Sequence, residues 1–293
     1  MVSIVIPARN ERFLNETLED ILKKAEGKIE ILVNLDENPP DKYINDPRVL
    51  YHSEHLGMRR GINKCVENAK GEYIMKTDAH CLFGQGFDKI LVDNHQKYNW
   101  IQVPRRYALD PVNWKIEERT DDKYPIDYMY TDFPRKGKRN DDGTHGVPWK
   151  ERREERKDPK YDIDETPCFQ GSCYFMTRNY FLTGLEGLHE EGYGEYAQET
   201  QEICFKTWLT GGSVMVNKKT FYAHLHKGQT YGRMYHLPGG VVEADAWSAS
   251  HWLNNEEPGM AHRFEWLIDV KFPNMPGWPK DWKEQIKEMG WIK

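Results

Sequence analysis

The first hundred residues alternate short apolar runs with amphipathic stretches, and this order most constrains the fold. The run VSIVI at residues 2–6 is β-branched and stops at Pro7, as expected of a buried parallel strand. Residues 14–26 place their leucines and an isoleucine on one helical face. Further strands are expected at 29–35, 49–51 and 72–76, and a second helix at 58–69. Strands that alternate with helices through short loops predict an α/β fold with a mostly parallel sheet flanked by helices.

The remaining chain changes character twice. Residues 105–165 are rich in charge and poor in aliphatic residues, which indicates an insertion or long loop over the sheet. From Cys168 the core pattern resumes, and the chain after residue 244 is rich in tryptophan. Strands are expected at 171–176 and 213–216, and a helix at 199–210. We therefore expect a main domain over 1–240 and a helical, tryptophan-rich extension over 241–293 that packs on it.

Composition limits the class of protein. A net charge of −6 argues against a protein that coats nucleic acid by charge alone, although it leaves room for a local basic groove. The five cysteines contain no CxxC pair, which favours reduced thiols over a disulfide framework or a zinc site. The amino terminus has no basic leader and no long apolar segment. We expect no membrane anchor, and a location in bacterial or virus-infected host cytoplasm.

Polar clusters follow three of the predicted strands. They are PARNE at 7–11, DEN at 36–38 and DAH at 78–80. Ligands of open α/β sheets bind beyond the carboxyl ends of the strands. We therefore expect the three clusters to meet at one edge of the sheet and to form a ligand site there.

Asp78 and His80 are candidate metal ligands because both can face one cavity from a turning segment. Carboxylate oxygen suits hard divalent cations, and manganese also accepts imidazole. An Asp-x-His triplet alone is a weak signal, since a hydrogen bond within a loop explains most such triplets. His224, in YAHLHK, is a candidate third ligand; His226 is the alternative, and a buried hydrogen-bonded histidine is the non-functional interpretation.

Several segments resemble a known family. VSIVIPARNE, ILVNLDEN and GEYIMKTDAHC resemble the opening of family-2-type glycosyltransferases with the GT-A fold. HLGMRRGINKCVENAKGEYIMKTDAHC is similar to the matching stretch of the polypeptide N-acetylgalactosaminyltransferases, as are FQGSCYFMTRNYF, EYAQETQEICFKTWLTGGSVMV, YAHLHK and TYGRMYHLPGG. The resemblance covers roughly 1–100 and 168–240, which makes 1–240 the catalytic domain, with the acceptor side at 105–165. It implies a UDP-sugar donor and a Mn²⁺ (or Mg²⁺) cofactor.

The resemblance also implies roles for individual residues. The implied metal ligands are Asp78, His80 and His224. The implied donor-binding residues are Pro7, Ala8, Arg9, Glu11, Asp36, Arg59, Thr77, Asp78, Tyr231 and Arg233. The implied catalytic residues are Glu199, Asp78 and Arg59. TYGRMYHLPGG corresponds to a mobile loop that closes over the donor, and Lys227 is a further cationic candidate there.

Stereochemistry and acceptor follow less directly. Thr200 stands where inverting family-2 enzymes carry the carboxylate base, so we expect transfer with retention. The acceptor is a hydroxyl compound: a glycan, a peptide, or a hydroxymethylated base in viral DNA.

Two other classes of protein compete with the glycosyltransferase interpretation. A nucleotidyltransferase would carry a glycine-rich phosphate loop after the first strand, which PARNERF lacks. A catalytically inactive sugar-nucleotide-binding protein would be expected to have lost its metal ligands.

Overall fold

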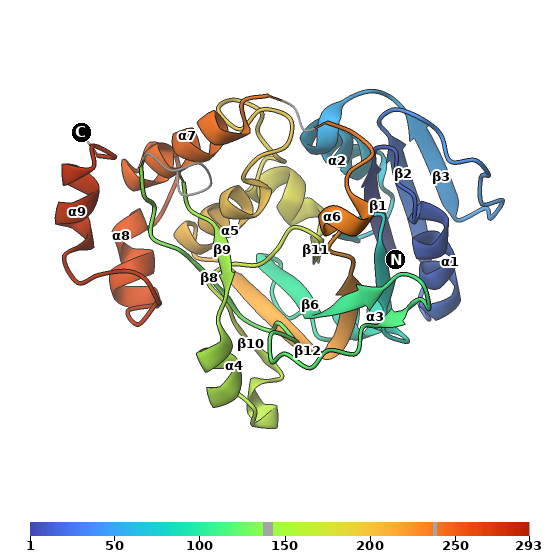
Figure 1. Ribbon diagram of the computed structural model, residues 1–293, viewed down its shortest axis with the longest axis horizontal. Coiled ribbons are helices and arrows are strands. Elements are labelled where there is room, and N and C mark those ends of the chain that lie inside the picture. The colour runs from blue at the N-terminus through green and yellow to red at the C-terminus, as the bar shows by residue number, and fades with distance from the viewer. Residues whose placement is uncertain (137–142, 237–238, 293) are drawn as a thin grey trace.

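The computed structural model describes residues 1–136, 143–236 and 239–292, and one twisted sheet organises it. The strands are β1 (Val2–Ala8), β2 (Ile29–Leu35), β3 (Val49–Ser53), β4 (Tyr73–Thr77), β5 (Cys81–Phe83), β6 (Trp100–Asp110), β7 (Lys115–Ile116), β8 (Met129–Thr131), β9 (Gly146–Pro148), β10 (Ile163–Glu165), β11 (Cys173–Thr177) and β12 (Ser213–His224). Within the described residues the main sheet runs β10-β12-β6-β11-β4-β1-β2-β3, while β5 pairs with β12 and β7 with β6 (Figure 1). Strands β8 and β9 form a separate ribbon.

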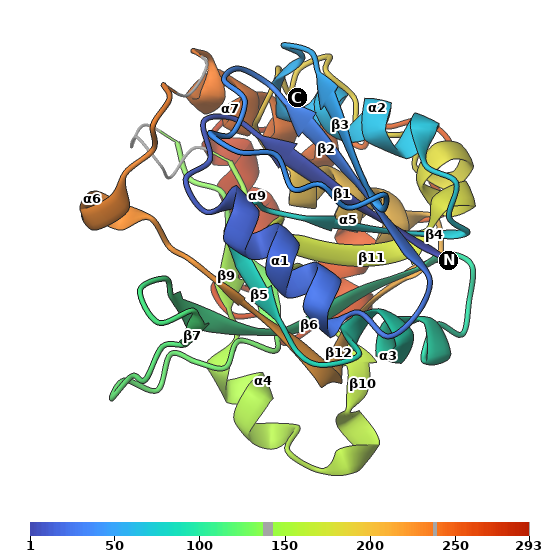
Figure 2. The same cartoon turned by 90° about the vertical axis from the view of Figure 1, so that its right-hand side faces the viewer.

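Two helices cover opposite faces of the first half of this sheet. They are α1 (Leu14–Lys24), which lies in front of the sheet in Figure 2, and α2 (Gly57–Asn68). Successive side chains of a strand point to opposite faces. Ile4 and Ile6 accordingly share a core with Leu18 of α1, whereas Val5 shares the other core with Ile62 of α2. The predicted strand–helix alternation is confirmed, and β1 to β4 are parallel.

The second half of the sheet is mixed, so the expectation of a mostly parallel sheet holds only for the first half. Strand β11 is antiparallel to both β4 and β6, while β12 is parallel to β6. Strand β5 then pairs antiparallel with β12, with Cys81 opposite His224. This pairing brings the carboxyl end of β4 next to the carboxyl end of β12, although the two ends are far apart in the sequence.

The charged segment 105–165 contains more regular structure than an insertion or long loop. Its first residues continue β6 to Asp110, and its last residues form β10 on the sheet edge. Between them lie β7, β8, β9, the helix α4 (Lys150–Glu155) and a 3₁₀ turn at Pro159–Tyr161. The charged residues of this segment obscure the end of β6 in the sequence. In the structure Arg105 of β6 is neutralised by Asp127, with Nε 2.7 Å from Oδ1, so its charge is compatible with a strand of the sheet. The residues 137–142 of this segment lie outside the described part.

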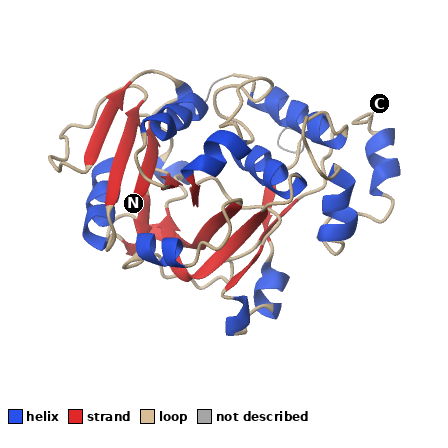
Figure 3. Cartoon of the chain, turned by 180° about the vertical axis from the view of Figure 1, so that it is seen from behind, coloured by secondary structure: helices blue, strands red, loops and turns tan. Residues whose placement is uncertain are grey.

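The remaining helices gather largely at one end of the molecule, as Figure 3 shows. They include α5 (Glu199–Leu209), α7 (Val241–Leu253), α8 (Phe264–Trp266) and α9 (Trp282–Glu288), with π-helical turns at Tyr180–Gly184 and Leu267–Lys271; α3 (Phe87–Asp93) and α6 (Gly228–Tyr231) lie elsewhere. Trp252 of α7 packs edge-on against Phe205 of α5, with ring centroids 5.3 Å apart. The tail tryptophans Trp252, Trp282 and Trp291 are buried in this shared core. Among the described helices, none has the length and apolar character needed to cross a membrane.

Candidate active site

A cavity of about 950 Å³ lies beyond the carboxyl ends of β1, β2, β4 and β12. Ala8, Asp36 and Asp78 line it from the ends of the first three strands, His224 from the end of β12, and Glu199 from the start of α5. Parallel strands place their carboxyl ends at one edge, which is where α/β sheets bind ligands. The three polar clusters predicted from the sequence meet at this cavity.

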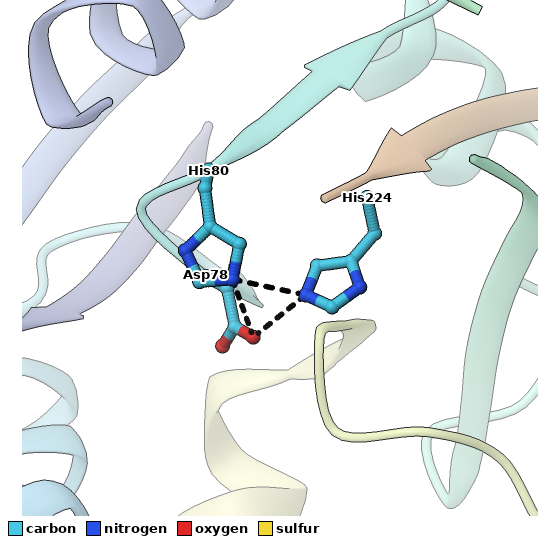
Figure 4. Close-up of side chains that lie close together, drawn as sticks. All are labelled: Asp78, His80 and His224. Carbon is cyan, nitrogen blue, oxygen red and sulfur yellow. Dashed lines mark hydrogen bonds and ion pairs between the residues drawn. The ribbon is translucent and has the colours of Figure 1, made fainter. Parts of the chain in front are cut away.

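Asp78, His80 and His224 form a cluster of candidate metal ligands, with ligand atoms within 4.8 Å of one another (Figure 4). Nε2 of His224 lies 3.2 Å from Oδ2 of Asp78 and 3.1 Å from Nε2 of His80. Nε2 of His80 lies 3.8 Å from the same carboxylate oxygen. The sequence left His224 and His226 as alternatives, and it is His224 that lies with the other two.

The protonation states of this cluster suit a divalent cation. Burial lowers the pKa of His224 to about 3, although a hydrogen bond to the Asp78 carboxylate acts to raise it, so the imidazole is neutral and can bind a metal ion. Burial acts to raise the pKa of Asp78, but Lys76 and the two histidines outweigh it and hold the pKa well below its usual range. One carboxylate and two imidazoles are a donor set that fits Mn²⁺.

The carboxylate of Glu11 lies beside Nδ1 of His80, the ring nitrogen that does not face Asp78 and His224. Its Oε2 lies 3.3 Å from Nδ1 of His80, and Lys227 donates hydrogen bonds of 2.7 Å to both of its oxygens. Burial acts to raise the pKa of Glu11, but His80 and Lys227 reverse the sign and lower it. A carboxylate beside one imidazole nitrogen favours the proton there and leaves the other nitrogen free for a metal. Glu11 also lines the cavity, as expected for a ligand-binding residue.

Glu199 is held against Asp78 by two residues that the sequence analysis did not single out. Tyr174 donates a hydrogen bond of 2.9 Å to Oε1 of Glu199. The fully buried ammonium of Lys76 lies 2.8 Å from Oδ1 of Asp78 and 3.5 Å from Oε2 of Glu199. Burial raises the pKa of Glu199, while Lys76 and Tyr174 act to lower it. A lysine inside the apolar run EYIMK was the sequence signal for this role, because an unpaired charge is costly in a core strand.

Most of the residues predicted to bind the donor do line the cavity. Asp36 accepts backbone hydrogen bonds of 2.6 and 2.7 Å from Leu56 and Gly57, which fixes the start of α2 beside the cavity. Arg9 is held by Glu37, with Nε 2.6 Å from Oε1. The predicted residues at the cavity wall are Pro7, Ala8, Arg9, Glu11, Asp36, Asp78 and Arg233.

Three predicted donor-binding residues are not among those that line the cavity. Arg59, expected to touch the donor, is fully buried, and both terminal nitrogens donate hydrogen bonds of 2.7 Å to Oε2 of Glu202. Thr77 is buried and donates to the carbonyl oxygen of Ser172 at 3.2 Å. Tyr231 packs against Phe13, with ring centroids 5.7 Å apart. In the structure Arg59 is therefore a buried residue paired with Glu202, and it is not among those that line the cavity.

The predicted closing loop lies next to this cavity only in part. Gly232, Arg233 and Tyr235 of this loop line the wall, as does Gly228 just before it, and α6 stands off one side of the molecule in Figure 2. Residues 237–238 of TYGRMYHLPGG lie outside the described residues.

The fold and the cavity together define a glycosyltransferase architecture of the GT-A type, a mixed α/β sheet with flanking helices and a cluster of candidate metal ligands at the strand ends. The family model for glycosyl transferase family 2 matches residues 3–182, more than half of the chain. The chain therefore belongs to glycosyl transferase family 2, as its motifs predicted.

Individual relatives agree with this assignment. Polypeptide N-acetylgalactosaminyltransferase 13 from human and from rat is 24% identical over 244 residues, which covers 82% of this chain and 37% of the relative. The chain thus spans a little over a third of the length of these curated relatives. A crystal structure of GalNAc-T7 with UDP, GalNAc and Mn²⁺ superposes with a TM-score of 0.69 at 17% identity, covering 96% of this chain and 59% of that one. S. aureus TarS 1–349 in complex with UDP-GlcNAc gives 0.55 at 13% identity, covering 93% and 71%. At these identities the structures show a shared fold.

Proposed function

We propose that this protein is a metal-dependent glycosyltransferase that moves a sugar from a UDP-sugar to a hydroxyl group of an acceptor. The proposal rests mainly on the convergence of Asp78, His80 and His224 at the wall of the large cavity. Family membership supports glycosyl transfer, and GalNAc-T7, which shares the fold, is bound to UDP, GalNAc and Mn²⁺.

The residues divide the work by position. A bound Mn²⁺ would supply positive charge where the leaving diphosphate becomes more negative. Asp78, His80 and His224 would hold that ion, and Glu11 would fix the orientation of His80. Arg233, on the cavity wall, is the cationic candidate for the diphosphate. Glu199 would lie beneath the transferred sugar, held in place by Tyr174 and Lys76.

We propose transfer with retention of the anomeric configuration. An inverting transfer needs a carboxylate that takes the acceptor proton on the face opposite the leaving group. Thr200 stands at the position expected for that base and has no carboxylate that could accept a proton. Its hydroxyl donates a hydrogen bond of 2.9 Å to the side chain of Gln201. In the retaining reaction the acceptor proton passes to the leaving diphosphate as the anomeric C–O bond breaks. An NMR spectrum of the first-formed product distinguishes the two outcomes, and an inverted anomer would refute retention.

The rival classes make different predictions. Membership of a glycosyltransferase family argues against a nucleotidyltransferase. An inactive sugar-nucleotide-binding protein would bind UDP-sugars without releasing UDP. The intact cluster of Asp78 and the two histidines, together with Glu199, favours the active enzyme.

A donor screen tests the proposal. Purified protein is incubated with a panel of UDP-sugars and with acceptors that include a serine peptide, an oligosaccharide and an oligonucleotide with hydroxymethylated bases. We expect UDP release that requires Mn²⁺ and is abolished by a chelator. Asp78→Asn should lose at least about 100-fold, because it removes both the negative charge and one ligand of the ion. UDP release that survives the chelator and Asp78→Asn would overturn the proposal.

A further inference from the structure

A second, smaller cavity opens beside the large one and is lined by cations. It measures about 270 Å³ and shares a wall with the large cavity that includes Gln170, Gly171 and Thr200. Arg106 and Lys123 line its other side. No aspartate or glutamate is among the residues in the described part of the chain that line it. This cavity is therefore positive, in a chain whose overall charge is −6.

Arg106 is directed to this cavity by the geometry of β6. Consecutive residues of a strand point to opposite faces, so Arg105 and Arg106 diverge. Arg105 forms two hydrogen bonds of 2.7 and 2.8 Å with the carboxylate of Asp127. The backbone of Arg106 is fixed by hydrogen bonds of 3.1 and 2.9 Å with Ile126, one in each direction. The strand therefore holds Arg106 in a defined place.

The guanidinium of Arg106 has no anionic partner in the described residues. Arg106 is only 5% exposed, and its Nε and Nη1 atoms are buried without a hydrogen-bond partner. Arginine stays protonated in proteins, so this is a buried positive charge, which is costly when unpaired. Arg59, the other deeply buried arginine discussed above, also has an unpartnered Nε, but both of its terminal nitrogens donate to the carboxylate of Glu202. The contrast indicates that Arg106 is kept for a partner that comes from outside the chain.

Lys123 adds a second positive charge to the same cavity. It is exposed and lies 5.8 Å from the ring of Tyr124, and Asp121, the acidic residue that interacts with its charge, forms its ion pair with Arg119. Phe169 and Met129 add apolar side chains to the lining of the cavity. Two cations of which one is a guanidinium fork match the charge and the shape of a phosphate group.

We propose that this cavity binds a phosphate group of the acceptor, so that the acceptor is a phosphate ester bearing the hydroxyl that receives the sugar. The inference rests on the proposed function, because the small cavity is an acceptor subsite only if the large one binds the donor. The shared wall of Gln170, Gly171 and Thr200 puts the two sites next to each other. A phosphate held by Arg106 and Lys123 would select such acceptors over neutral hydroxyl compounds.

Calorimetric titration tests the site directly. The full-length protein is first saturated with UDP and Mg²⁺, which blocks phosphate binding in the large cavity, and is then titrated with glycerol 1-phosphate, glycerol or glycerate. We expect one equivalent of glycerol 1-phosphate to bind, with at least tenfold weaker binding in Arg106→Gln and a smaller loss in Lys123→Gln. Arg48→Gln removes the same charge from an exposed site just before β3, where Arg48 pairs with Asp46, and is the matched control.

Each outcome bears on the proposal. Absence of saturable phosphate binding, or binding that Arg106→Gln leaves unchanged, would overturn it. Glycerate that binds as tightly as glycerol 1-phosphate would overturn the choice of phosphate in favour of a carboxylate. If UDP itself does not bind, the proposed function fails, and the same titration of unloaded wild-type and Arg106→Gln protein still tests the anion site.

A stability measurement separates a binding role from a structural one. Because the charge of Arg106 is buried without a partner, Arg106→Gln should leave the unfolding midpoint of the ligand-free protein unchanged or raise it. A structural arginine would behave oppositely. A drop in the midpoint comparable with that of an Arg59 variant would overturn the assignment of Arg106 to an external anion.

Discussion

Lys76 and Asp78 lie on the same side of one chain segment, with Nζ of the lysine 2.8 Å from Oδ1 of the aspartate. Side chains two residues apart in extended chain share a face, so the end of β4 delivers both to the cavity. The same ammonium donates to the carbonyl oxygen of Gly171 at 2.5 Å. One oxygen of Asp78 is thereby fixed and the other, Oδ2, is left towards His80 and His224.

Replacing Lys76 by methionine should lower UDP release by about 10- to 100-fold, in the range found for partners that orient metal ligands. The reason is that Asp78 and Glu199 would both lose the cation that offsets their mutual repulsion in a buried site. Steady-state assays with saturating Mn²⁺ measure the effect, and Lys97→Met, at an exposed lysine, is the control. Activity within twofold of wild type would show that the ammonium does not position these carboxylates.

Tyr174→Phe should move the acidic limb of the pH–rate profile to higher pH. The phenol donates to Glu199 and acts to lower its pKa, against the burial that raises it. Without the phenol the pKa of Glu199 rises further, so the ionised form is lost at a higher pH as the solution is acidified. Profiles of UDP release from pH 5 to 8 for wild type and variant test this. A limb that stays in place or moves to lower pH would contradict an ionised Glu199 in the reaction.

Arg59→Met should reduce stability without removing the donor site. The substitution removes both hydrogen bonds that Arg59 donates to Oε2 of Glu202, a residue that is 1% exposed, although Lys206 still lies 3.0 Å from Oε1. Loss of one partner from a buried ion pair costs about 3 kcal/mol or more of unfolding free energy. Urea unfolding gives that quantity, and UDP titration of the folded variant should stay within about threefold of wild type. A large loss of UDP affinity at unchanged stability would restore Arg59 to the donor site.

The order of strands and helices in the first hundred residues could be predicted because it is written in local patterns: VSIVI, the helical face of α1, and the polar residues that follow each strand. Those patterns also located the metal candidates. The partners of a buried charge could not be predicted in this way. Arg59 and Glu202 are 143 residues apart, and nothing in GMRRG distinguishes a buried arginine from one that meets a ligand. The same holds for Arg105, whose partner Asp127 could not be predicted, so the end of β6 was not recognised inside the charged segment.

His95 should make the protein less stable in acid. Burial lowers the pKa of His95 to about 4, below the ordinary value of about 6.5, so the folded state binds fewer protons than the unfolded state between these values. Stability is therefore full above pH 6.5 and is lost as the pH falls towards 4. Relative to His95→Phe, which has no titrating group, wild type should lose up to about 3 kcal/mol over this range. Parallel pH dependences of unfolding in the two proteins would contradict the assigned titration.

Gly171→Ala should impair catalysis while the fold persists. A Cβ at Gly171 would lie 2.5 Å from Oε2 of Glu199, closer than side chains tolerate, so the carboxylate must move. Glu199 is tied to Tyr174 and Lys76 and cannot move without breaking those contacts. A shift of about 1 Å in a positioned group reduces turnover by about 100-fold, and we expect a loss of that order in kcat.

The control for this variant is Gly259→Ala, which lies outside the large cavity, since a Cβ at that glycine meets nothing within 4 Å and its positive φ costs alanine about 1 kcal/mol of stability. Circular dichroism of both variants should resemble wild type, because the clash at Gly171 can be relieved by the Glu199 side chain alone. We expect UDP release near wild type for Gly259→Ala and strongly reduced for Gly171→Ala. Equal activity in the two variants would mean that the position of the Glu199 carboxylate, and with it the arrangement around Lys76, is not needed for transfer.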